Sequence, residues 1–190
     1  MDNSQTSTCT NIYFDHEQLE VYNVLSRLWI EHVLWTRGYI KSQINNLADL
    51  EEVTKRLLRN PADFADVLEQ FYGEDNAALF ESLFTEHVII ASEIIKAVIN
   101  NDVNTFEEKE KEWYANADEI SLFLAGINPN WDDEMWKNMF YEHLDMTQNQ
   151  FLLMLNSHYA DSITQYDFIQ DEALIMADYM ACGIIQQFLM

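Results

Sequence analysis

The sequence predicts an all-α protein, folded as an antiparallel helical bundle. Only 4 Gly and 2 Pro stand beside 48% hydrophobic residues, which leaves little turn chemistry for a multi-stranded sheet and ample material for long helices. Hydrophobic side chains recur every three or four residues along most of the chain, the spacing of one helical face. With 190 residues, the chain is long enough for one sizeable core and short for two, so we expect a single domain.

The first elements are a tail and two helices. Residues 1–14 are rich in Ser, Thr, Asn and Gln without periodicity, and we expect a disordered tail there, followed by the helical domain over 15–190. The first helix is predicted over 15–47, because its apolar residues share one face. A second is predicted over 49–72 with a break at Asn60–Pro61, where Asn can cap one segment and Pro can begin the next.

Four more helices follow. One is predicted over 75–100 and another over 105–125, where Gly126 ends it. The last two are predicted over 132–158 and over 161–190.

A Glu-His pair recurs along these helices at near-constant spacing. Glu86-His87 and Glu142-His143 lie 56 residues apart, and Glu31-His32 precedes the first of these by 55. The same 56-residue step also relates Asn60 to Asn116. Repeats of this kind indicate a duplicated structural unit.

Each of these histidines lies in the middle of an apolar helical stripe. Glu172 in the last helix is flanked in the same way, by Ile169, Ile175 and Met176, and Asp171 precedes it as the glutamates precede the histidines. Four helices therefore present three His and one Glu to the core. We expect these four to form the core of the bundle, with the other two as additional or connecting helices.

The buried positions of these side chains suggest a metal site. An imidazole or carboxylate in an apolar interior is costly unless it is hydrogen-bonded, paired or bound to a cation. We predict direct coordination of zinc, iron or manganese by the three His and Glu172, for redox chemistry or metal handling. The preceding acids would orient the imidazoles or hold a second ion; they are Glu31, Glu86, Glu142 and Asp171.

A second hypothesis stays open beside the metal site. The Glu-His steps could interlock the helices through hydrogen bonds in a satisfied polar core. The protein would then be a non-enzymatic structural or interaction bundle with an acidic surface. The sequence leaves open whether the protein is an enzyme, because it shows no phosphate-binding loop and no nucleophile elbow.

Two stretches carry a resemblance to known proteins. The run from Trp113 to Ile120 (WYANADEI) and the run from Asn128 to Trp131 (NPNW), together with the Glu-His helices, resemble a family of small bacterial helical proteins of uncharacterised function. The resemblance implies a helical fold and brings no activity. Similarity to ferritin-like and hemerythrin-like metal bundles is architectural, because their ligand spacings do not occur at the three Glu-His pairs.

Charge and the N-terminus bear on partners and location. A formal charge of -23 would repel phosphate backbones and anionic lipids, so we expect no nucleic-acid or membrane partner and allow a basic protein partner. The first residues lack the positive charge and apolar run of a signal peptide, and two cysteines do not suggest a disulfide framework. We predict a cytoplasmic protein.

Overall fold

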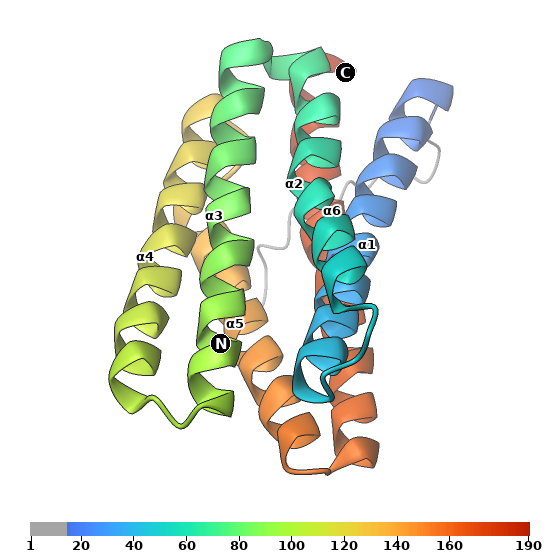
Figure 1. Cartoon of the computed structure of the whole chain (residues 1–190). Helices are drawn as coiled ribbons and strands as arrows, with labels where there is room; N and C mark the ends of the chain where they lie inside the picture. Colours follow the sequence, from blue (N-terminus) through green and yellow to red (C-terminus); the bar gives the residue numbers. More distant parts are fainter. Residues whose placement is uncertain (1–14) are drawn as a thin grey trace, which may run out of the picture.

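The computed structural model describes residues 15–190, so the predicted tail over 1–14 lies outside the described residues. Six long α-helices make up this part of the chain (Figure 1). They are α1 (His16–Ile44), α2 (Leu50–Tyr72), α3 (Glu74–Ile99), α4 (Val103–Ile127), α5 (Asp133–Leu155) and α6 (Tyr159–Phe188).

The six helices form a closed ring. Each helix packs against the next one in the chain, and α6 packs back against α1. Neighbouring helices run in opposite directions (Figure 1), so the predicted all-α antiparallel bundle is confirmed. Every helix takes part in the ring, which differs from the expected division into four core and two connecting helices. The reason is that α2 and α4 also carry long buried faces of their own.

The ring consists of three similar hairpins, α1–α2, α3–α4 and α5–α6. The turn of each hairpin holds one residue with positive φ, 14 positions after the histidine of its Glu-His pair: Asn46 (49°), Asn101 (56°) and Ser157 (62°). The amide of the following residue donates to a carbonyl five positions earlier, as Leu47 does to Ser42 at 2.9 Å. The same helix-ending motif therefore closes the first helix of all three hairpins.

Helix α2 continues through Pro61, so the predicted break at Asn60–Pro61 is wrong. Proline in a helix removes one backbone hydrogen bond. Here the buried Asn60 side chain donates from Nδ2 to the carbonyl of Leu28 on α1 at 3.0 Å. This contact between helices fixes the segment, and tertiary packing outweighs the local preference of proline.

Aromatic residues pack the core on one side of the three histidines. Trp29, Phe84 and Phe140 each lie one turn before a histidine and are fully buried. The ring centroid of Trp29 is 5.8 Å from that of Phe84 and 6.2 Å from that of Phe140. This layer closes one end of the histidine cluster.

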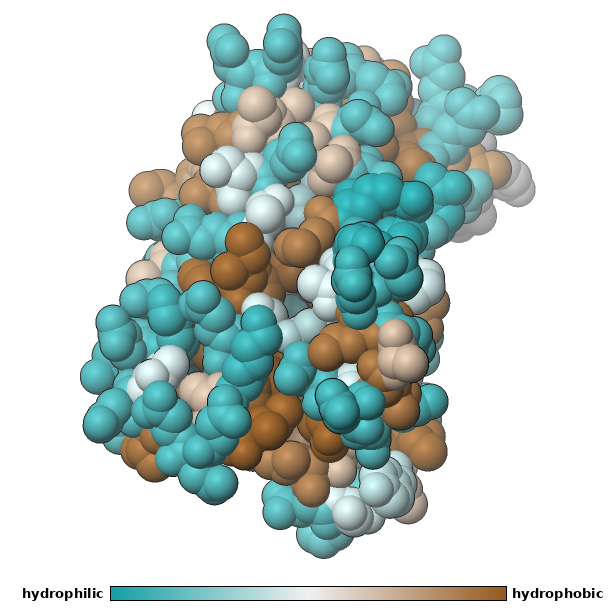
Figure 2. Space-filling view, viewed as in Figure 1, coloured by the Kyte–Doolittle hydropathy of each residue, from teal (hydrophilic) through white to brown (hydrophobic). Residues whose placement is uncertain are grey.

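Hydrophilic and hydrophobic side chains both reach the surface. Figure 2 shows hydrophilic side chains over much of one face, with hydrophobic groups between them. Among the helices of the described residues, none is long and apolar enough to cross a membrane. Cys182 on α6 is buried and is not a free thiol. The cytoplasmic location stays a prediction.

Candidate metal centre

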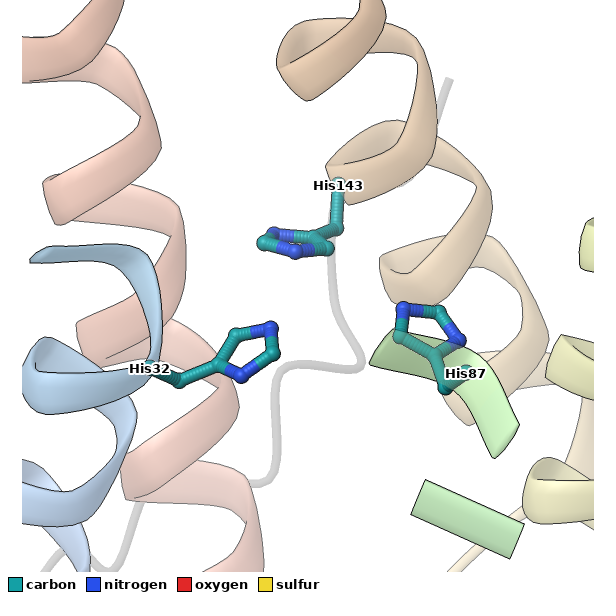
Figure 3. Close-up of side chains that lie close together, drawn as sticks. All are labelled: His32, His87 and His143. Carbon is teal, nitrogen blue, oxygen red and sulfur yellow. The ribbon is translucent and has the colours of Figure 1, made fainter. Parts of the chain in front are cut away.

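The odd-numbered helices bring His32, His87 and His143 together at the centre of the ring. Each side chain is almost completely buried, with a relative exposure of 2%, 1% and 2%. The ring centroids lie 5.5 to 6.5 Å apart, and one nitrogen from each ring lies within 4.8 Å of the other two. Figure 3 shows the three rings approaching one another from separate helices.

A side chain from the other helix of the same hairpin holds each ring from behind. Nδ1 of His32 lies 3.2 Å from Oδ1 of Asn60 on α2, and Nδ1 of His87 lies 3.0 Å from Oδ1 of Asn116 on α4. In the third hairpin, Nδ1 of His143 lies 3.1 Å from Oε2 of Glu172 on α6. Asn60, Asn116 and Glu172 are themselves 56 residues apart.

These contacts determine where the imidazole protons lie. Nδ2 of Asn60 donates to the carbonyl of Leu28 at 3.0 Å, and Nδ2 of Asn116 donates to the carbonyl of Leu83 at 3.0 Å. A carbonyl can only accept, so each amide must present its oxygen to the histidine, whose Nδ1 must then donate. This tautomer leaves Nε2 of His32 and His87 as a bare acceptor.

Glu172 has the same orienting effect on His143 and adds a charge. A carboxylate only accepts, so it also favours the proton on Nδ1 of His143. Glu172 is 6% exposed, and its second oxygen, Oε1, is buried without a partner among the described residues. Nε2 of His87 is likewise buried without a partner. A buried carboxylate beside three imidazoles is costly unless a positive charge compensates it.

Burial disfavours a proton on His32 or His87 as the source of that positive charge. Burial lowers the pKa of His87 to about 3, and the charge of His143 acts in the same direction. Burial, with the charges of His143 and His87, holds the pKa of His32 well below its usual value. Hydrogen bonds that the histidines donate to Asn60 and Asn116 oppose these shifts without cancelling them. Both rings are therefore neutral near pH 7, the state in which imidazole binds metals.

The acids that precede the ring-facing residues do not join the cluster. Glu31 is partly exposed and pairs with Arg56 on α2, with an Nη2–Oε2 distance of 2.7 Å. Glu86, Glu142 and Asp171 are exposed on the outer side of their helices. A residue next to a core position on a helix is rotated by about 100° from it, and in this ring that rotation leads to solvent.

Sequence reasoning missed the role of Asn60 and Asn116. Their 56-residue spacing was visible, and one more step of the same length leads to Glu172. That extension would have placed Glu172 on the second helix of a hairpin, behind a histidine, in the position of the two asparagines. The structure shows the Glu172 side chain at Nδ1 of His143. Direct coordination of a metal by Glu172 stays a prediction.

Comparison with known proteins adds no assignment. No family model, no curated protein and no solved structure matches this chain. The resemblance to a bacterial helical family therefore stays a prediction, and the functional argument depends on the site itself.

The geometry of the cluster is close to that of a three-histidine metal site. Zinc–imidazole bonds of about 2.0–2.1 Å place tetrahedral ligand nitrogens about 3.3 Å apart. The nitrogens here lie within 4.8 Å of one another. Side-chain rotations would bring all three within bonding distance of one central metal ion. The buried cluster could hold a metal ion.

Proposed function

We propose that this protein binds one divalent transition-metal ion through Nε2 of His32, His87 and His143. The observation that carries the proposal is the fixed orientation of the rings. Each Nδ1 has its own hydrogen-bond acceptor, and the Nε2 atoms share one buried space. Nε2 of His32 and of His87 are both acceptors, and that of His87 has no partner among the described residues; a cation in this space would bind both and compensate the charge of Glu172.

The donor set favours certain metals. Neutral imidazole suits zinc, iron, copper and nickel, whereas manganese and magnesium favour carboxylate and water. Among zinc, iron and manganese, a three-imidazole site therefore favours zinc or iron. Glu172 takes part through His143, since a carboxylate bound to Nδ1 raises the basicity of the ligand nitrogen. Such a site supports redox chemistry with iron or metal handling with either ion.

The first test is the metal content of protein purified without chelator, together with its melting temperature after metal removal and after addition of zinc, iron(II) or manganese(II). The proposal predicts close to one ion per chain and a melting temperature that rises on addition, because a ligand that binds only the folded state stabilises it. His87→Ala and His87→Leu should both lose this stabilisation.

His158→Ala is the matched control, because His158 is exposed at the start of α6 and should leave the metal response unchanged. Substoichiometric metal, with no thermal response to any of the three ions, would contradict the proposal and favour a polar core. In that case His87→Ala should cost about 1–3 kcal/mol through an unpaired Asn116, with or without metal. Metal-induced stabilisation that survives in both His87 variants would remove His87 from the site.

A further inference from the structure

A small cavity adjoins the three histidines on the side away from the aromatic layer. Thr36, Ala91 and Thr147 each lie one turn beyond a histidine and line it, so the histidines have aromatic rings one turn before them and small side chains one turn beyond them. The larger side chains of Tyr39 and Trp113 also line the cavity. The space holds about one water-sized sphere, ≈ 10 Å³. A volume of this size is about the minimum that a buried water needs.

The lining offers hydrogen-bond donors in an otherwise apolar setting. Besides the two threonine hydroxyls, the lining includes the indole of Trp113. Trp113 is 2% exposed, and its indole Nε1 is buried without an acceptor among the described residues. An unsatisfied buried N–H is costly, and its position beside a cavity calls for an occupant that can accept a hydrogen bond.

Part of the cavity lining is accessible to solvent. Thr36, Ala91 and Ser92 are only half-buried, whereas the aromatic residues on the opposite side are fully buried. A metal held by three nitrogens from helices α1, α3 and α5 has its fourth tetrahedral position along the axis of the cluster. The aromatic layer closes one direction of that axis, so the fourth position faces the cavity.

We propose that this cavity is a ligand pocket for the fourth coordination position of the metal, occupied by water or hydroxide and open to exchange with a neutral diatomic molecule. The inference depends on the proposed metal site. Three protein ligands and one exchangeable position are the arrangement of catalytic rather than structural zinc and iron centres. The volume limits the exchangeable ligand to one or two non-hydrogen atoms.

The test uses cobalt(II) as a spectroscopic substitute and nitric oxide as the diatomic probe, under anaerobic conditions. Bound cobalt is measured by metal analysis, and the d–d absorption bands report its coordination. The wild-type protein should bind one cobalt per chain, and nitric oxide should change the bands. Ala91→Leu fills the cavity from α3 and should retain cobalt while the apparent affinity for nitric oxide falls at least tenfold.

Ala115→Leu serves as the control, because Ala115 is exposed on α4 and should leave both cobalt and nitric oxide binding unchanged. Stoichiometric cobalt with bands that do not respond to nitric oxide would overturn the pocket and leave the metal site standing. An Ala91→Leu variant that binds nitric oxide as the wild type does would also overturn it. Failure of the wild type to bind cobalt would contradict the metal site, and the pocket with it.

Discussion

At the scale of single residues, the site depends on the second nitrogen of each imidazole. Asn60 and Asn116 use both ends of their amides, one toward a histidine and one toward a carbonyl of the neighbouring helix. An amide in this arrangement sets the tautomer of the imidazole without adding charge. In the third hairpin Glu172 takes the place of the asparagine and brings a carboxylate next to His143.

Replacing that carboxylate separates its charge from its shape. Glu172→Gln keeps the length of the side chain and an oxygen for Nδ1 of His143, but removes a buried negative charge. We expect metal affinity to fall about 10- to 100-fold, while the free energy of unfolding of the metal-free protein stays the same or increases. Competition titrations with a chromophoric chelator and urea unfolding in excess chelator measure the two quantities. An unchanged metal affinity would show that Glu172 does not act on the site.

The depressed pKa values predict how the metal-free protein responds to acid. The pKa of His87 is about 3 in the folded protein and about 6.5 in an unfolded chain. Between these values the unfolded state binds a proton that the folded state does not. Above about pH 6.5 His87 does not change the free energy of unfolding with pH. Between about pH 6.5 and pH 3 it lowers that free energy by about 1.4 kcal/mol for each pH unit that the pH falls.

A comparison with His87→Leu isolates this contribution from the many surface carboxylates. The unfolding free energies of both proteins are measured in excess chelator at pH 7 and pH 5. The value for the wild type should fall more between these pH values than that for His87→Leu, because leucine cannot be protonated. Equal pH dependence in the two proteins would show that His87 binds a proton as readily in the folded state as in the unfolded chain, contrary to its burial.

At the scale of helices, the hairpin is the repeated unit. Its first helix supplies a histidine and its second helix supplies the group that orients that histidine. The helix-ending turn with a left-handed Asn or Ser lies at the same position in all three copies. Ion pairs join hairpins or their helices at partly exposed positions, such as Lys109 of α4 with Glu93 of α3, 3.1 Å from Nζ to Oε2. Packing of buried residues, rather than these pairs, carries most of the stability.

One close approach between elements gives a sharp test of this packing. A Cβ atom at Gly183 on α6 would lie 1.9 Å from Nε1 of Trp131, a buried indole that donates to the carbonyl of Tyr179 at 3.2 Å. We expect Gly183→Ala to lower the free energy of unfolding by about 1–3 kcal/mol, because the indole must move. Chemical denaturation measures this change.

Gly126→Ala is the matched control in α4. A Cβ there meets nothing within 4 Å, and alanine in a helix is favoured over glycine by about 0.5–1 kcal/mol. The two substitutions should therefore change stability in opposite directions. A stabilising Gly183→Ala would show that Trp131 does not dock against α6 as described.

At the scale of the whole molecule, much of the fold follows from sequence patterns. Low glycine and proline content and continuous three- and four-residue periodicity are enough to predict an antiparallel helical bundle. The repeat places the three histidines on equivalent faces, and the structure brings them together. The break predicted at Pro61 failed because local propensity is weak beside buried contacts between helices.

The pairing of helices was harder to infer. Glu172 lies on an apolar stripe like the histidines, so face position alone made α6 look like a fourth equivalent helix. The 56-residue spacing of Asn60, Asn116 and Glu172 marks the second helix of each hairpin. Only the ring arrangement shows that these three side chains bind Nδ1 of the histidines. Three hairpins around one axis therefore explain the repeat better than four equivalent helices.

The most direct test of the central claim is a crystal structure of the metal-loaded protein, with anomalous scattering recorded at the absorption edge of the bound metal. We predict one strong anomalous peak inside the ring, about 2.0–2.2 Å from Nε2 of His32, His87 and His143, with each Nδ1 still bound to Asn60, Asn116 or Glu172. A peak only among surface carboxylates, or Nε2 atoms that bind one another or water with no metal between them in metal-soaked crystals, would contradict the account.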